Sequence, residues 1–534
     1  MDASPTVAEA IAAEIVRAGV ARVFGFPGGG GNLDLMDAFG AAGVEFVLAR
    51  SEGSAALMGC AHAELTGRPA VVVVGSGPGL ASVVNGVANA HLDRVPLVVI
   101  SDRQTDAEAA TTGHQLLDQR ALLAPVTKWG TTLQSAGAAS SMRRALGVAS
   151  AYPRGPVHLD LPRATAGEPA RPGPEPELQP GAVTADLDAI ATGLGAAERP
   201  LLLIGLEAAR GVDQRDVVEL VRRLRCPVLT TYKAKGVVPE SDGAWAGILS
   251  GGELERPLLE RADALLGVGL DPVELLTKPW PYEAPFYALR EAGLGDEYFA
   301  PAASAAGALG ELAAQLWRAL PERTTGTWTR AEIERCRDGV LPALDIRADH
   351  LNAGAVVDIV RRHAPDAIVA VDAGAHMLPV TTTWRVERPG RFLISNGLAT
   401  MGFAVPAAIA AAALDRDAVV VAFTGDGGLA YNLAELETAR RLGVRVVVVV
   451  FNDSSLSLIR IKLQATGRPG TSLDLAETDF SALARGFGCE GEIARTPQEL
   501  SDAMARALAR EHSTVLDARL SGLEYGPLLK VIRG

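Results

Sequence analysis

One segment near the C-terminal end constrains the fold of this chain most. An apolar run at 418–424 has the composition of a buried strand, and it stops at the Gly-Asp-Gly of 425–427, after which a helical pattern begins. A second apolar run, at 444–451, ends at the Asn-Asp pair of 452–453. Strands that alternate with helices form parallel sheets, whose ligands bind at the carboxyl ends of the strands. We therefore expect both polar ends to lie at one edge of an open sheet.

These residue types favour phosphate and metal chemistry at that edge. Glycines let the backbone close around a phosphate group, and the start of a helix offers free N–H groups to it. The carboxylates of Asp426 and Asp453 suit a hard cation such as Mg²⁺. The pattern predicts a diphosphate held through a metal. The Gly-Asp-Gly alone is equally typical of a tight turn after a strand.

Composition narrows the class of protein. The chain has 534 residues and a net charge of −13 without charged blocks, which favours two to four domains and argues against nucleic-acid or membrane-surface binding. Its apolar stretches are too short for a membrane span, and its first residues do not resemble a signal peptide. Four scattered cysteines indicate reduced thiols. We expect a cytoplasmic enzyme.

The pattern of strands and helices predicts an α/β protein with three doubly wound parallel-sheet domains. They are expected at 1–167, 184–325 and 346–534, joined by a proline-rich linker at 168–183 and a charged linker at 326–345. The first and third segments share a size and a strand rhythm, which indicates two related sheets around a different middle one.

The unit from Gly425 to Asp453 resembles the signature of thiamine diphosphate (ThDP) enzymes. That signature is Gly-Asp-Gly, a helix and strand, and an Asn-Asn or Asn-Asp pair; here Asp453 follows Asp426 by 27 residues, as the family pattern requires. The three-part order extends the resemblance over the whole chain, to the acetolactate synthase, pyruvate oxidase and 2-oxo acid decarboxylase family. It implies ThDP and Mg²⁺ as cofactors. It also implies a pyrimidine-binding first domain, a diphosphate-binding third domain, and a homodimer or homotetramer with sites between subunits.

The resemblance assigns roles in the third domain. Asp426, Asp453 and the Ser455 carbonyl would hold the metal, although the family usually has Asn at position 453. Met401 would wedge under the cofactor, and the Ala399 carbonyl would accept a bond from the pyrimidine amino group. The remaining cofactor contacts would come from Gly374, His376, Gly425, Gly427 and Gly428. Ala375 replaces a family Gln, which puts one hydrogen bond to the diphosphate in doubt.

The resemblance also assigns the other half of the site. Glu52 would share a proton with a pyrimidine nitrogen, whereas from the residues alone it is an ordinary acid at the start of a helix. The Gly28-Gly29-Gly30 loop would approach the reacting centre, with Gly29 catalytic and its neighbours near the substrate. Gln115 matches a family residue. His114 replaces Phe and is either a proton shuttle or a structural residue.

The substrate is a small 2-oxo acid or α-dicarbonyl compound in this interpretation, and the reaction is that of an acetolactate synthase-like carboligase or lyase. Leu458 and Lys462, four residues apart on one helix face, would contact the substrate, although a solvated helix lysine is an equal alternative. Decarboxylase, C–C hydrolase and flavin-containing oxidase are the alternative activities. FAD is not expected, because the middle segment lacks the arginine-rich stretch of the flavin-binding members.

Overall fold

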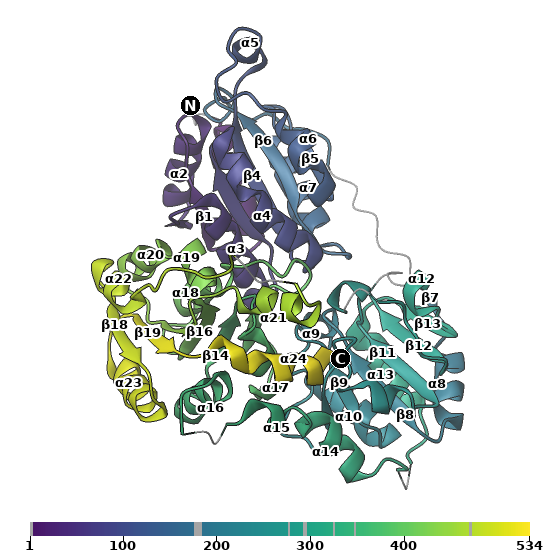
Figure 1. Cartoon of the computed structure of the whole chain (residues 1–534). Coiled ribbons are helices and arrows are strands. Elements are labelled where there is room, and N and C mark those ends of the chain that lie inside the picture. Colours follow the sequence, from purple (N-terminus) through teal and green to yellow (C-terminus); the bar gives the residue numbers. More distant parts are fainter. Residues whose placement is uncertain are drawn as a thin grey trace. The chain divides into compact units, whose positions relative to one another are not determined.

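The computed structural model describes residues 4–175, 184–275, 278–291, 296–323, 326–346, 349–468 and 472–533. Within these residues the chain forms three sheets flanked by helices (Figure 1), which confirms the expected α/β class. The second half of the proline-rich linker, 176–183, lies outside the described residues. The domain boundaries stay predictions; two helices, α14 (Arg330–Asp338) and α15 (Leu341–Leu344), occupy most of the expected charged linker.

The first sheet is parallel throughout, in the order β2-β1-β3-β4-β6-β5. Its central strands are runs of buried β-branched residues, as expected for a sheet covered on both faces. The strands are β1 (Arg22–Phe26), β2 (Glu45–Leu48), β3 (Ala70–Val74), β4 (Leu97–Arg103), β5 (Trp129–Thr132) and β6 (Val157–Pro162). The helices are α1 (Val7–Arg17), α2 (Gly31–Ala41), α3 (Glu52–Thr66), α4 (Pro78–Leu92), α5 (Asp106–Ala109), α6 (Gln119–Leu123) and α7 (Ala138–Ser150).

The middle sheet has a different order, β10-β9-β8-β11-β12-β13-β7, and its last strand is antiparallel. Its strands are β7 (Thr184–Ala185), β8 (Pro200–Ile204), β9 (Val228–Thr230), β10 (Trp245–Ile248), β11 (Ala264–Val268), β12 (Phe286–Arg290) and β13 (Ala303–Ala306). The helices that precede α14 are α8 (Leu187–Ala196), α9 (Ala208–Gly211), α10 (Gln214–Leu224), α11 (Arg256–Leu259), α12 (Asp296–Phe299) and α13 (Leu309–Ala319).

The third sheet, β15-β14-β16-β17-β19-β18, is again parallel throughout and repeats the strand order of the first. Its strands are β14 (Ile368–Val371), β15 (Phe392–Ile394), β16 (Val420–Gly425), β17 (Val447–Asn452), β18 (Glu490–Ala494) and β19 (Thr514–Arg519). The helices are α16 (Ala353–His363), α17 (Met377–Thr383), α18 (Ala404–Leu414), α19 (Asp426–Tyr431), α20 (Glu435–Leu442), α21 (Ser457–Ala465), α22 (Phe480–Gly486), α23 (Pro497–Ala509) and α24 (Tyr525–Arg533).

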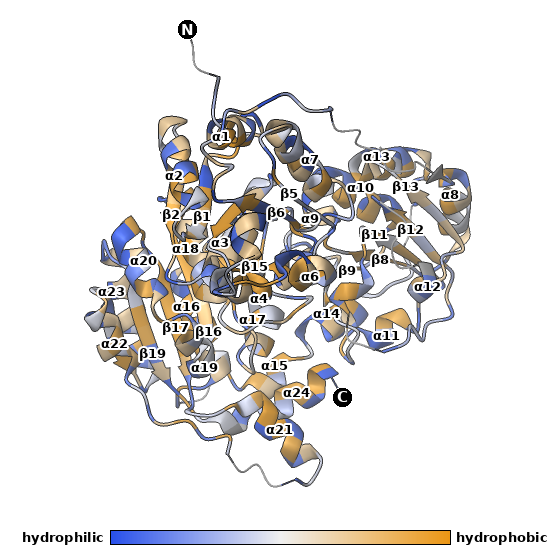
Figure 2. Ribbon diagram, turned by 90° about the horizontal axis from the view of Figure 1, so that it is seen from above, coloured by the Kyte–Doolittle hydropathy of each residue, from blue (hydrophilic) through white to orange (hydrophobic). Residues whose placement is uncertain are grey.

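The chain divides into two compact units, and the division does not follow the sequence order. The first unit contains 1–180 together with 406–415 and 432–442, so that α20 groups with the first sheet although it connects two strands of the third. In Figure 2, strands β16 and β17 are hydrophobic orange and α20 is largely hydrophilic blue. No helix in the described part of the chain is long and apolar enough to cross a membrane.

Candidate active site

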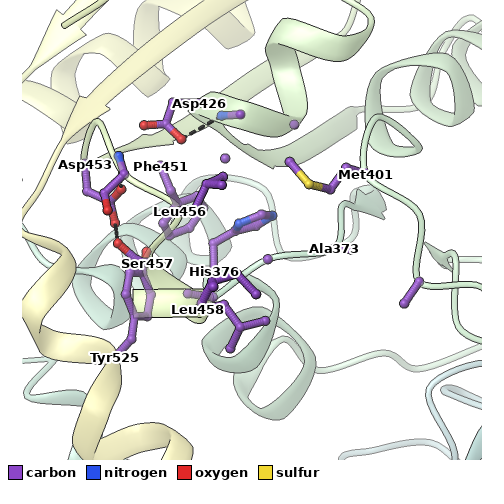
Figure 3. Close-up of a pocket in the computed structure, with 18 residues that line it drawn as sticks. Ala373, His376, Met401, Asp426, Phe451, Asp453, Leu456, Ser457, Leu458 and Tyr525 are labelled. Atoms are coloured by element: carbon purple, nitrogen blue, oxygen red, sulfur yellow. Dashed lines mark hydrogen bonds between the residues drawn. The ribbon is translucent and has the colours of Figure 1, made fainter. Parts of the chain in front are cut away.

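A cavity of about 220 Å³ opens where strands β14, β16 and β17 of the third sheet end, with α21 and α24 beside it (Figure 3). Most of the site residues predicted for this domain line it together. They are Gly374, His376, Ala399, Met401, Gly425, Asp426, Gly427, Gly428, Asp453, Ser455 and Leu458. Lys462 lies one turn further along α21, is exposed and does not line the cavity.

Asp426 is the first residue of α19 and is almost fully buried. Its Oδ1 accepts a hydrogen bond from the Gly427 N–H at 2.6 Å. Its Oδ2 is buried and has no hydrogen-bond partner among the described residues. Burial raises the pKa of this carboxyl, although nearby backbone N–H groups oppose the rise. A buried acceptor without a partner costs free energy of folding, and a bound ligand that contacts this oxygen would remove that cost.

Asp453 supplies a second carboxylate to the same wall of the cavity (Figure 3). It accepts hydrogen bonds from the Ser455 N–H at 3.1 Å and from the Ser457 hydroxyl at 2.6 Å. Burial, and next the negative charge of Asp426, raise its pKa to about 6. The turn that follows Asp453 is tight, because Ser454 has a φ of 52°.

Two neighbouring carboxylates that disfavour each other's charge are a fitting donor set for a divalent cation. A hard cation takes oxygen ligands and would offset the repulsion between them. No group of three or more His, Cys, Asp or Glu side chains is placed to hold a metal ion in the described ranges. Two carboxylates and a backbone carbonyl therefore suit Mg²⁺, which keeps several waters, better than a transition metal that needs a full set of protein ligands.

The rest of the cavity combines a buried imidazole with apolar groups. His376 stacks on Phe451 at 5.3 Å between ring centroids, and burial lowers its pKa to about 3, so the ring is neutral. Its Nε2 has no partner among the described residues. A Cβ at Gly427 would lie 3.1 Å from the Met401 methyl group, so glycine there lets Met401 approach α19.

Ala399 has a left-handed backbone conformation, with a φ of 52°. Residues other than glycine rarely adopt it, and such strain is found where the surrounding structure fixes a functional group. The segment is held by a hydrogen bond from the Thr400 N–H to the Ser395 hydroxyl at 3.0 Å. The conformation therefore fixes the direction of the peptide at a residue that lines the cavity.

Some residues that organise or line this cavity belong to none of the motifs found in the sequence. Asp372, at the end of β14, accepts from the Phe403 N–H and the Thr424 hydroxyl, both at 2.9 Å, and so joins the Met401 segment to β16. Its place between a strand and a glycine-containing turn could have revealed it. Phe451, Leu456 and Tyr525 also line the cavity. Tyr525 comes from α24 at the end of the chain, and no local pattern in the sequence points to it.

In the first domain, Glu52 is the first residue of α3, after the helix cap Ser51. A Cβ at Gly79 would lie 3.2 Å from Glu52 Oε1, so glycine at the start of α4 makes room for this carboxyl group. The predicted glycine loop packs closely as well: a Cβ at Gly28 would lie 3.0 Å from the Cα of Gly75, whereas a Cβ at Gly29 would meet nothing within 4 Å.

A polar cavity of about 400 Å³ lies at the carboxyl edge of the first sheet, and Gln115 lines it. Gln115 has a φ of 56°, and a Cβ at Gly77 would lie 2.8 Å from it. The exposed neighbour His114 accepts a hydrogen bond from the Gln104 amide through its backbone carbonyl at 2.5 Å. The His114 ring does not line this cavity.

At the carboxyl edge of the middle sheet, protein carboxylates take the backbone donors that a nucleotide phosphate would use. Glu274 is buried and accepts from the Leu206 N–H at 2.8 Å and the Thr231 hydroxyl at 2.5 Å. Burial raises its pKa to about 8. Glu207 accepts from the Glu291 N–H at 2.7 Å.

Comparison with known proteins identifies the family of the three domains. Models of the "Thiamine pyrophosphate enzyme" N-terminal TPP binding, central and C-terminal TPP binding domains match residues 5–122, 187–288 and 372–518. The 4-hydroxybenzoylformate decarboxylase of Rhodococcus jostii, a thiamine diphosphate-dependent enzyme, has the same fold, with a TM-score of 0.84 at 21% identity over 97% of this chain and 99% of that one.

Curated relatives extend over nearly the whole chain. The acetolactate synthase of Bacillus subtilis is 28% identical over 96% of this chain and 92% of its own length. The acetolactate synthase large subunit of Parasynechococcus marenigrum is 30% identical over 94% and 86%, and a "probable 2-ketoarginine decarboxylase" of Pseudomonas aeruginosa is 29% identical over 93% and 90%. The chain therefore belongs to the thiamine pyrophosphate-dependent enzymes, among the relatives of acetolactate synthases and 2-oxo acid decarboxylases.

Proposed function

We propose that this enzyme is a ThDP- and Mg²⁺-dependent, acetolactate synthase-like carboligase or lyase that acts on a small 2-oxo acid or α-dicarbonyl compound. The observation that carries the proposal is the unpartnered, buried Oδ2 of Asp426 beside Asp453, in a cavity that also contains His376 and Met401. This set supplies oxygen ligands, a neutral hydrogen-bonding ring and an apolar support to one ligand.

In this proposal each group of the third domain has one task. Asp426, Asp453 and the Ser455 carbonyl would hold Mg²⁺, and the N–H groups at the start of α19 would bind the diphosphate. His376 would contact the diphosphate as a neutral ring. Met401 would support the cofactor, and the Ala399 carbonyl would accept a hydrogen bond from its pyrimidine amino group. ThDP, when bound, supplies a carbanion nucleophile and then an electron sink for the acyl group of the substrate.

The first domain supplies the proton relay and the substrate contacts. Glu52 holds a proton against the pyrimidine ring nitrogen, which is the acid–base step that activates the cofactor. The loop of Gly28, Gly29 and Gly30, together with Gln115 and His114, contacts the substrate. Leu458 and Lys462 do so from the third domain. We propose that Glu52 of one chain and the Asp426 cavity of a second chain complete one site, in a cytoplasmic homodimer or homotetramer.

A 2-oxo acid decarboxylase is the second candidate, favoured by the two relatives that carry decarboxylase names. A C–C hydrolase would use the same groups. The buried carboxylates Glu207 and Glu274 support a protein without flavin.

Two measurements test the proposal in sequence. Calorimetry of the purified protein should show ThDP binding with Mg²⁺ and none with EDTA, and a yellow protein would contradict the absence of flavin. A panel of 2-oxo acids is then assayed for CO₂ release and, by mass spectrometry, for ligated products. CO₂ with a ligated product indicates a carboligase, and CO₂ with the simple aldehyde indicates a decarboxylase. If ThDP does not bind with Mg²⁺ present, the proposed function is wrong.

A further inference from the structure

The start of α3, which carries Glu52, is held by a segment that lies far away in the sequence. Residues 432–442, between the two metal-site strands β16 and β17, belong to the same compact unit as the first sheet. We call this segment, Asn432 to Leu442, the α20 clamp. Its contacts with the junction between β2 and α3 fall on both sides of Glu52.

The central contact is made by Glu435, the first residue of α20, whose side chain is almost fully buried. Its Oε1 accepts the Arg50 N–H at 2.9 Å, and its Oε2 accepts the Thr438 hydroxyl at 2.7 Å. The backbone N–H groups before a helix have no partner within the helix itself. Glu435 therefore acts as a cap supplied from another part of the chain, in addition to the local cap Ser51.

Two further bonds lie on either side of this one. The Ser54 hydroxyl, two residues after Glu52, donates to Asn432 Oδ1 at 2.9 Å. The Arg441 guanidinium donates to the backbone carbonyl of Leu48, at the end of β2. The chain is thus held by the backbone at 48 and 50 and by the side chain at 54, so Glu52 leaves α3 from a fixed position toward the space beside Gly79.

The buried charge of Glu435 points to more than packing. Burial raises its pKa, and the surrounding N–H and hydroxyl donors, those of Arg50 and Ser54 among them, oppose the rise. Burying a carboxylate costs free energy of folding, and an apolar residue would pack at this position at lower cost. The hydrogen bonds that Glu435 makes therefore serve a purpose beyond packing. Glu437, two residues later, shows the contrast: it is partly exposed and lies 4.0 Å from the Arg50 guanidinium.

We propose that Glu435, assisted by Asn432, is a positioning residue that holds Glu52 in the orientation needed for cofactor activation. The inference rests on the proposed function, because it gives Glu52 the proton-sharing role. Displacement of a reacting group by about 1 Å can cost roughly 100-fold in rate. Loss of the Glu435 bonds should therefore slow activation while cofactor binding, which depends on the Asp426 cavity, stays nearly unchanged.

The test compares Glu435→Ala with Glu435→Gln, whose amide can still accept from the Arg50 N–H and bond Thr438. Arg440→Gln, at an exposed position on the same helix, is the control. Hydrogen–deuterium exchange of the apo-protein, read on peptides that cover 47–58, reports whether the clamp is released. Proton exchange at C2 of bound ThDP, at equal saturation, reports activation. We expect faster amide exchange and roughly 10- to 100-fold slower C2 exchange in Glu435→Ala, with both restored close to wild type in Glu435→Gln.

Asn432→Ala, which removes the acceptor of the Ser54 hydroxyl at a half-buried position and keeps Glu435, gives a milder variant in case Glu435→Ala does not fold. It should show the same two changes at smaller size. Wild-type C2 exchange in every folded variant would overturn the positioning role even if the 47–58 peptides lose protection, since Glu435 would then serve stability alone. Failure of the wild-type protein to activate ThDP would instead reject the proposed function, and the amide exchange would still show whether the clamp exists.

Discussion

The first and third sheets have the same strand order, yet their carboxyl edges are built for different partners. In the third sheet, β16 and β17 end in Asp426 and Asp453, two carboxylates that raise the cost of each other's charge. In the first sheet, β3 is followed by Gly75, and β4 carries a single buried carboxyl, Asp102, near its end. The shared topology places each edge at the carboxyl ends of parallel strands, but the residues there differ. We propose that the third-sheet edge binds a cation and that the first-sheet edge accommodates a ring.

The largest effect should come from a change at Glu52, which follows a strand of the first sheet. Glu52→Gln keeps a hydrogen-bonding amide but cannot share a mobile proton, so C2 proton exchange of bound ThDP should slow by about 10²–10⁴-fold while ThDP affinity changes little. Glu64→Gln, near the far end of the same helix, is the control. An exchange rate equal to wild type would falsify the role of Glu52 and leave the cofactor assignment intact.

A change at the carboxyl edge of the third sheet should alter the affinity for ThDP and not the rate at which bound ThDP is activated. Asp426→Ala should weaken Mg²⁺-dependent ThDP binding by at least about 30-fold, since loss of one partner from a buried charged cluster costs about 2–5 kcal/mol and each 1.4 kcal/mol is about tenfold in affinity. Calorimetry in Mg²⁺ measures it, with the exposed Asp502→Ala on α23 as the control. Unchanged affinity would show that the anchoring site lies elsewhere.

The buried Asp102 carboxyl of the first sheet should make the stability of the protein depend on pH. Burial raises the pKa of Asp102 to about 7, against the nearby positive charge of Arg163 and with the smaller help of Asp34. A raised acid pKa means that the unfolded chain loses its proton first, so stability falls as pH rises from about 4 to 7 and is then constant.

Asp102→Asn removes this loss. Relative to wild type, the variant should gain up to about 3 kcal/mol between pH 5 and pH 8, because about two pKa units lie in that window. Urea unfolding at the two pH values measures the gain. Asp106→Asn, whose side chain is 88% exposed, should show none. An equal stability difference at both pH values would show that Asp102 is ionised with ordinary ease in the folded protein.

The smallest effect is expected at the position where this chain departs from the family. Asp453→Asn restores the more usual residue and removes the repulsion with Asp426. ThDP affinity in Mg²⁺ should change by no more than about 3-fold, whereas the metal-free protein should melt at a higher temperature. Thermal unfolding with EDTA and calorimetry with Mg²⁺ separate the two effects. A large loss of affinity would mean that the second full charge is required.

The sequence predicted the regular parts of this comparison well, for physical reasons. An apolar run that ends in a polar residue predicts both a buried strand and the edge of the sheet where that strand ends, so Asp426 and Asp453 could be placed together. Met401 could be added from its surrounding motif, and all three line one cavity. Tyr525 could not be predicted, because it reaches the cavity by tertiary packing of a distant helix. Lys462 lies one turn of α21 beyond Leu458, where its side chain is exposed and does not line the cavity, so its contact with the substrate stays a prediction.

The α20 clamp also limits how this protein can be divided. Segments that are continuous in sequence are usually treated as exchangeable modules, but here a stretch encoded within the third domain completes the hydrogen bonds of the first. A chimaera that takes its third domain from a relative would replace Glu435 by the relative's residue at that position. If that residue cannot accept a hydrogen bond, the Arg50 N–H is left unpaired. The two domains are therefore expected to change together during evolution, and recombination between them should be tolerated only where this segment is inherited with the first domain.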